Sequence, residues 1–269
     1  MPAVTPWALL LEYDGTSFIG WQRQATGLSV QSVLEDAAAK LFAGTPVPSV
    51  VAGRTDAGVH AAGQVAMLSL PSHLRAEQVR NALNFHMRPN PVVVLRAAVA
   101  AAGWSPRFDA IRRHYRYRIL NRRSRPALNL GRIWHVERPL DAGAMAEAAR
   151  HLLGRHDFTS FRASACQARS PLRTLDRLDV IRHGDDIEIE AEARSFLHHQ
   201  VRNMVGTLRL VGDGRWPPAR VAAVLAARNR HEAGPTAPPD GLCLVAVTYP
   251  SDPFTPDGRN DGKVGHFGG

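Results

Sequence analysis

Residues 53–60 read Gly-Arg-Thr-Asp-Ala-Gly-Val-His, a largely polar stretch that lies between two apolar ones. The flanking segments, 47–52 and 64–70, are rich in valine, alanine and leucine, which favours two strands joined by a loop at 53–63. Further out, apolar residues at helical spacing predict a helix on each side, and an apolar strand comes before the first helix and after the second. The predicted elements are strands at 7–13, 47–52, 64–70 and 92–99 and helices at 30–41 and 75–85. This β-α-β-β-α-β order is that of a ferredoxin-like unit.

The second half of the chain repeats this order with longer connections. Its predicted elements are strands at 114–121, 174–182, 187–193 and 242–249 and helices at 141–153, 196–211 and 217–227. We therefore expect an α+β protein of two ferredoxin-like (RNA-recognition-like) units, with mainly antiparallel sheets side by side and a central cleft between them. The expected division is 1–103 for an N-terminal half that carries Asp56 and 104–250 for a C-terminal half that carries Tyr115 and Arg202. Residues 251–269 lack apolar periodicity, which predicts a disordered tail.

The charge of the chain indicates an acidic partner. Its 33 basic and 24 acidic side chains give a formal net charge of +9, and all but Lys40 and Lys263 of the basic residues are arginine. A genome rich in arginine codons explains the arginine bias equally well, but it does not explain why arginines cluster between 107 and 125. There, Tyr115 and Tyr117 alternate with arginines, so a strand would place aromatic rings on one face and cations on the other. Such an element is a plausible surface for RNA.

Several classes of protein are disfavoured by the composition. No stretch approaches the roughly 18–20 apolar residues that span a bilayer, and residues 1–7 lack the features of a signal peptide. We therefore expect a cytoplasmic protein that does not enter a membrane. Cys166 and Cys243 are too few for a disulfide framework or a four-cysteine zinc site, and no P-loop or Rossmann fingerprint is present.

Asp56 admits more than one interpretation from the residues alone. It can be part of an ordinary turn in which Gly58 takes a positive φ, or it can be an ionised nucleophile held by a cation. Arg54 is near it in sequence and Arg202 is a distant candidate for that cation. A hydrolase built on Asp56 and His60 is one competing function. A non-catalytic RNA-binding protein is another, but it leaves unexplained a carboxylate that would repel phosphate in a cationic region.

The octapeptide at 53–60 is one of several segments with a family resemblance. The others are Glu-Tyr-Asp-Gly at 12–15 with Gly-Trp-Gln-Arg-Gln at 20–24, the arginine-tyrosine strand at 113–117, Asp-Phe-Thr-Ser-Phe-Arg at 157–162, and 198–203. In this order they resemble the motifs of the tRNA pseudouridine synthase A family, over about residues 9–250. One departure is Gln200, which stands where the family pattern leads us to expect an apolar residue.

The resemblance implies isomerisation of uridine to pseudouridine at positions 38, 39 and 40 of the tRNA anticodon stem-loop, by base flipping and without a metal or organic cofactor. It implies that Asp56 attacks C1′ of the ribose or C6 of uracil, or acts as a base for elimination. Tyr115 would stack on the flipped uracil, with Tyr117 expected in the core. Arg202 would pair with Asp56 and keep it ionised, and Arg54 would help to extrude the base or hold a phosphate. A homodimer is also implied. The resemblance further implies that the N-terminal half, 1–103, is the catalytic one and that the central cleft is the active site.

The paired histidines are expected to have structural roles. His198 and His199 lie within the helix predicted at 196–211, where adjacent side chains point about 100° apart. Two such residues cannot face one metal ion in the way that a pair four residues apart does. His60 has no third ligand near it in the sequence, so no metal site is predicted.

Overall fold

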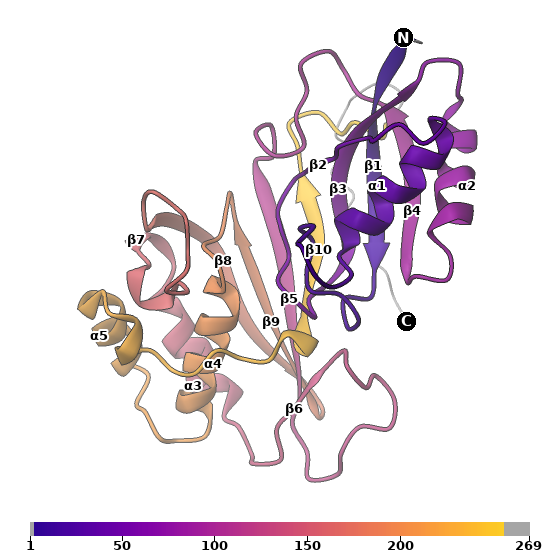
Figure 1. Ribbon diagram of the computed structural model, residues 1–269. Helices are drawn as coiled ribbons and strands as arrows, with labels where there is room; N and C mark the ends of the chain where they lie inside the picture. The colour runs from indigo at the N-terminus through magenta and orange to yellow at the C-terminus, as the bar shows by residue number, and fades with distance from the viewer. Residues whose placement is uncertain (1–2, 256–269) are drawn as a thin grey trace.

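The computed structural model describes residues 3–255 and has the mixed α+β composition and mainly antiparallel sheet that the sequence predicts (Figure 1). The strands are β1 (Val4–Tyr13), β2 (Val50–Val51), β3 (His60–Pro71), β4 (Val92–Val99), β5 (Arg112–Leu120), β6 (Trp134–His135), β7 (Gly154–Asp157), β8 (Leu172–His183), β9 (Asp186–Ala193) and β10 (Leu242–Thr248). The helices are α1 (Val30–Leu41), α2 (Ala76–Met87), α3 (Ala142–Arg150), α4 (Gln200–Gly212) and α5 (Arg220–Ala227). Of the predicted disordered tail, residues 256–269 lie outside the described residues.

All the strands belong to one sheet. Its order is β4-β1-β3-β10-β5-β9-β8-β7, and β2 and β6 pair with β3 and β5 outside this path. The C-terminal strand β10 joins the two halves, because it pairs parallel with the start of β3 and antiparallel with β5 (Figure 1). In this register Cys243 lies opposite His60 on one side and Arg116 on the other. The loop that precedes β3 and the tyrosines of β5 are thereby brought to the middle of the sheet.

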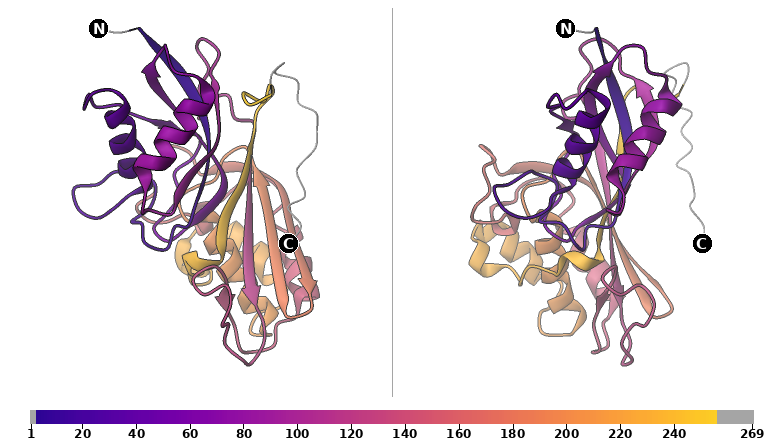
Figure 2. Two further views of the ribbon diagram at one scale, coloured as in Figure 1. Left: turned by 90° about the vertical axis from the view of Figure 1, so that its right-hand side faces the viewer. Right: turned by 45° about the vertical axis from the view of Figure 1, so that its right-hand side comes forward.

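The helices pack against this sheet through one large cluster of buried apolar side chains. Helices α1 and α2 lie against the β4-β1-β3 half, and α3, α4 and α5 lie over the other half (Figures 1 and 2). The core cluster runs from Trp7 and Leu34 in the first half to Tyr117 and Met204 in the second. Phe158 and Phe161 are fully buried. Among residues 3–255, no helix combines the length and the apolar character needed to cross a bilayer.

The strand expected at 64–70 already begins at His60, so the predicted loop at 53–63 is too long. Two other predicted boundaries are wrong, each for a local reason. The strand expected at 47–52 is only Val50–Val51, because proline lacks the N–H that a ladder needs and Pro46 and Pro48 precede it. The helix expected at 196–211 begins at Gln200, because His199 has a left-handed backbone with φ of 61°. The later start of α4 rearranges the side chains near Asp56.

Candidate active site

Asp56 lies in a turn that the β1–α1 connection holds from two sides. The preceding Thr55 accepts a backbone hydrogen bond from Trp21 (3.0 Å), and its hydroxyl lies 2.8 Å from the Tyr13 hydroxyl. On the other side, Gly58 takes a positive φ of 77° and donates its N–H to Phe18. The chain on both sides of Asp56 is therefore fixed by contacts with residues 13–21.

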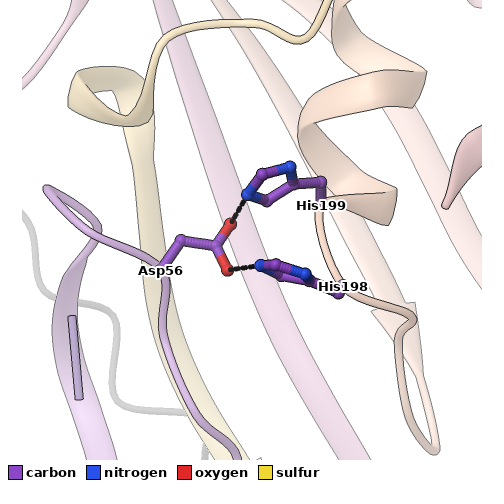
Figure 3. Close-up of side chains that lie close together, drawn as sticks. All are labelled: Asp56, His198 and His199. Atoms are coloured by element: carbon purple, nitrogen blue, oxygen red, sulfur yellow. Dashed lines mark ion pairs between the residues drawn. The ribbon is translucent and has the colours of Figure 1, made fainter. Parts of the chain in front are cut away.

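Three nitrogen-bearing side chains surround the Asp56 carboxylate. Arg202 donates from Nη1 to Oδ2 at 3.3 Å, and the Nε2 atoms of His198 and His199 lie 3.3 Å from Oδ1 and 3.5 Å from Oδ2 (Figure 3). Arg202 is oriented by a second hydrogen bond, from Nε to the Ala237 carbonyl at 2.8 Å. The carboxylate is mostly buried, with 19% of the side chain exposed. The pairing of Asp56 with Arg202, residues 146 positions apart, matches what the resemblance implies.

The expectation that His198 and His199 cannot both face the same group is wrong. It assumed that both belong to a helix, but α4 starts one residue after His199. The left-handed backbone at His199 turns the chain so that both imidazoles reach the same carboxylate, with ring centroids 4.1 Å apart (Figure 3). Histidine is among the residues that adopt this conformation more often than others, but no local pattern marks where it will occur. No pattern in the sequence therefore indicated that His198 and His199 are neighbours of Asp56.

The donor atoms of Asp56, His198 and His199 lie within 4.8 Å of one another. Two imidazoles and a carboxylate at such spacing are ligands that Zn²⁺ accepts. Here Arg202 already supplies a positive charge to the same carboxylate oxygen that His199 approaches. Burial lowers the pKa of His199 below its usual value, in spite of the attraction of Asp56, so this imidazole is neutral at pH 7.

The β5 tyrosines lie on one face of the strand, as the alternation in the sequence predicts, and that face is buried. Tyr115 is 8% exposed and packs edge-on against Phe196, with ring centroids 5.3 Å apart. Burial raises the pKa of Tyr115 above its usual value, and the charge of Asp56 acts in the same direction, so the phenol is protonated at neutral pH. Tyr117 is fully buried and donates its hydroxyl to the Pro238 carbonyl, which confirms its predicted place in the core.

Arg54 is exposed, in contrast to Arg202. Its side chain forms no ion pair with any carboxylate of residues 3–255, Asp56 included. The structure therefore assigns the cation beside Asp56 to Arg202 and leaves the Arg54 guanidinium facing solvent at the edge of the site.

The cationic face predicted for β5 is neutralised by its neighbour. Arg112, Arg116 and Arg118 form ion pairs with carboxylates of β9, at 3.3 Å to Glu192, 2.6 Å to Glu190 and 2.9 Å to Asp186 respectively. These pairs follow from the antiparallel register of the two strands. The expected row of free cations on this strand is therefore wrong, and an RNA phosphate would have to compete with carboxylates there.

Both ring nitrogens of His60 have backbone partners in other loops. Its Nδ1 accepts the backbone N–H of Gly15 at 3.0 Å, and its Nε2 lies 2.9 Å from the carbonyl oxygen of Gly131. Asp14 lies 3.2 Å from the same ring and accepts two hydrogen bonds from Arg132. These contacts tie the last residue of the octapeptide to two other loops, and they weigh against a hydrolase built on Asp56 and His60.

Asp14 should stabilise this junction in a pH-dependent way. Partial burial raises the pKa of Asp14, but hydrogen bonds from Thr16 and Arg132 outweigh burial, and the pKa falls to about 2. Because the folded state favours the ionised form, the stabilisation is complete above about pH 4 and is lost as pH falls through about 2. We expect Asp14→Asn to lower the free energy of unfolding by about 1–2 kcal/mol at pH 7. Denaturant unfolding of both proteins between pH 7 and pH 2 measures this, and a difference that does not shrink below pH 4 would contradict it.

A cavity of about 580 Å³ opens beside the two histidines. Its walls include His198, His199, Ser164 and Arg230, whereas Asp56 does not line it. The volume lies within the usual range of small-molecule pockets, about 300–1,000 Å³. The two histidines therefore border this cavity and also contact the Asp56 carboxylate.

A known protein family matches most of the chain, including the segments that meet at Asp56. A family model described as tRNA pseudouridine synthase matches residues 10–109 and 148–250, which include Asp56, His198, His199 and Arg202. Tyr115 falls in the unmatched interval between the two segments. The match therefore covers the loop and the helix start that meet at the carboxylate.

Curated relatives match over nearly the whole chain. The tRNA pseudouridine synthase A of Acidiphilium cryptum is 71% identical, over 92% of this chain and 98% of its own length. The proteins of the same name from Gluconobacter oxydans and Paramagnetospirillum magneticum are 54% and 60% identical, over 94% and 90% of this chain and 94% of each relative. With the match to the family model, these identities show that the chain belongs to the tRNA pseudouridine synthase A family of isomerases.

Proposed function

We propose that the protein converts uridine to pseudouridine at positions 38, 39 and 40 of the tRNA anticodon stem-loop, with Asp56 as the nucleophile. The observation that carries this proposal is the Asp56 carboxylate, which is mostly buried and is held by Arg202 next to two histidines. A carboxylate oriented by a cation can reach an electrophilic carbon of a bound nucleotide. In a protein that only binds RNA, such a group would repel phosphate and serve no purpose.

The reaction needs no external reagent. The N1–C1′ bond breaks, uracil turns, a C5–C1′ bond forms, and the C5 proton leaves while N1 gains one. In this scheme Asp56 attacks C1′ or C6, or removes a proton to start elimination. Arg202 keeps the carboxylate oriented, and Tyr115 stacks on the uracil. Because the Tyr115 phenol is protonated at neutral pH, it serves as a stacking surface and a hydrogen-bond donor, and the C5 proton passes to another acceptor such as water.

The target base has to leave its stack to reach a buried carboxylate. We assign its extrusion to Arg54, since its exposed guanidinium lies two residues from Asp56 without a carboxylate partner among residues 3–255. An arginine plane can fill the space that a flipped base leaves, or it can hold the neighbouring phosphate.

We also infer the domain organisation, the oligomeric state and the location of the enzyme. The strand orders β4-β1-β3 with β2, and β10-β5-β9-β8, support two ferredoxin-like units, 1–103 and 104–250, with the cleft where they meet at β10. A homodimer in the cytoplasm would provide a second basic surface for the rest of the tRNA. Light scattering across a dilution series tests the assembly, and a single-chain mass with full activity on intact tRNA would argue against the dimer.

Tritium release from tRNA transcripts labelled at C5 of uridine tests the reaction directly. The proposal predicts release without any change in the mass of unlabelled tRNA treated in parallel. A hydrolase would change the mass of the tRNA or release uracil from it. A protein that only binds RNA would release no tritium. Either of these results would contradict the proposal.

The activity should not depend on a transition metal. Arg202 supplies the positive charge at Asp56, so we expect a Zn²⁺-selective chelator, followed by dialysis into Mg²⁺ buffer, to leave the rate within about twofold. Added Zn²⁺ should inhibit, because an ion held by Asp56, His198 and His199 would occupy the oxygens of the nucleophile. Loss of activity on chelation that Zn²⁺ restores would instead show a required metal.

A further inference from the structure

A second cavity, of about 230 Å³, is lined by three arginines. Arg155 comes from β7, Arg173 from β8, and Arg194 directly follows β9, so three neighbouring strands contribute to it. The other lining residues are Leu172, Thr174 and Ser195, and none of the six carries a carboxylate. Three arginines, a threonine and a serine around one cavity offer cationic and hydroxyl donors to an anion and no competing acceptor charge.

The charges of this cavity are not neutralised by the protein. None of the three arginines forms an ion pair with a carboxylate of residues 3–255, although Arg177 on the same strand as Arg173 pairs with both Asp179 and Glu192. Arg173 donates from Nη1 only to backbone carbonyls, and its buried Nε has no acceptor among the described residues. Within residues 3–255, the three arginines that line this cavity therefore lack the carboxylate partners that Arg177 has.

The cavity is close to the nucleophile along the chain. Arg194 and Ser195 begin the segment that ends with His198 and His199, which contact Asp56. Three residues extend the chain by at most about 11 Å, so the Cα atoms of Ser195 and His198 are no farther apart than that. An anion in the cavity would therefore lie within a few nucleotides of a uridine bound at Asp56.

We propose that Arg155, Arg173 and Arg194 bind one phosphate group of the RNA strand that carries the target uridine. The assignment rests on the proposed function, because it takes tRNA as the substrate of the same site. Guanidinium groups match the oxygens of a phosphodiester with paired hydrogen bonds, and the hydroxyls of Thr174 and Ser195 complete the donor set. The contact positions the strand and leaves the reacting atoms to Asp56.

The salt dependence of tRNA binding tests this assignment. The double variant Arg155→Gln/Arg194→Gln removes two exposed charges, and Arg75→Gln/Arg80→Gln removes two charges beside β4, at the opposite edge of the sheet. Dissociation constants for unmodified tRNA are measured over a range of salt concentrations. For the cavity variant we expect weaker binding and a log–log slope smaller by about 0.7–0.9, the value for one phosphate. The control pair should keep the wild-type slope.

Two further measurements sharpen the test. An isolated anticodon stem-loop should show the same change in slope as intact tRNA, and the cavity variant should raise KM by a larger factor than it lowers kcat. Arg173→Gln should weaken binding in the same direction as the double variant. A cavity variant with the slope of the control pair would overturn the proposal, and an effect confined to intact tRNA would place the phosphate in another arm.

The outcome is separable from that of the proposed function. If the wild type releases no tritium from labelled tRNA, the isomerase proposal fails, whatever the slopes are. If it releases tritium and the cavity variant binds like the control pair, only the phosphate site fails. Unfolding midpoints of all variants show whether a loss of binding reflects a loss of fold.

Discussion

Asp56→Asn is expected to reduce pseudouridine formation by at least about 10³-fold, a rise of about 4 kcal/mol in the barrier. Asparagine keeps the size of the side chain but cannot act as a carboxylate nucleophile or base. Binding of tRNA should survive, because it depends on contacts with many phosphates. Tritium release and a dissociation constant for unmodified tRNA measure the two effects separately.

Asp36→Asn is a matched control for this variant. Asp36 is an exposed carboxylate on α1 with its own arginine partner, Arg23 at 2.7 Å, and it plays no part in the site. Its replacement should leave the rate near that of wild type. If Asp56→Asn kept activity within about tenfold of wild type, a difference of only about 1.4 kcal/mol, Asp56 would not be the nucleophile.

Gly15→Ala should damage both stability and activity, since Gly15 packs against the chain that follows Asp56. A Cβ at this position would lie 2.1 Å from the Val59 carbonyl oxygen and 2.9 Å from the Gly58 carbonyl carbon, so the backbone at 58–59 would have to move. We expect a loss of roughly 1–3 kcal/mol of stability, the usual cost of overpacking. A shift of about 1 Å in the Asp56 loop would lower kcat/KM by about 10²-fold. Thermal unfolding and the tritium assay measure these effects.

Gly53→Ala shows whether the effect belongs to the close contact at Gly15. Gly53 lies in the same loop, but a Cβ there would meet nothing within 4 Å, and its φ is not in the left-handed region. Its unfolding midpoint should stay close to that of wild type. Equal destabilisation by both alanines would contradict the account of the loop, and so would a Gly15→Ala protein as stable and active as wild type.

The sequence predicted the elements better than the contacts between them. The strands and helices follow from local periodicity, and most were predicted within a few residues. The link between Asp56 and Arg202 spans 146 residues. The residues alone left Arg54 and Arg202 both open as the cation, and only the family resemblance favoured Arg202. The histidine contacts depend on the left-handed backbone of His199, just before α4. A helical pattern of apolar residues does not predict this conformation.

The β5 arginines illustrate a different reason for a wrong prediction. Taken alone, 107–125 is strongly basic, which indicated an RNA surface. The acidic partner was visible elsewhere in the sequence, because Asp186, Glu188, Glu190 and Glu192 alternate along β9 with the period of a strand. Neither segment alone shows that β5 pairs with β9, and this pairing brings the two charged faces into register.

We propose that this chain isomerises specific uridines of tRNA by means of Asp56. Mapping pseudouridine at single-nucleotide resolution in an unmodified tRNA transcript, after treatment with the wild type or with Asp56→Asn, tests it most directly. We expect pseudouridine at those of positions 38, 39 and 40 that hold uridine, and none after treatment with the variant. Pseudouridine confined to another arm of the tRNA, or formed equally well by the variant, would contradict it.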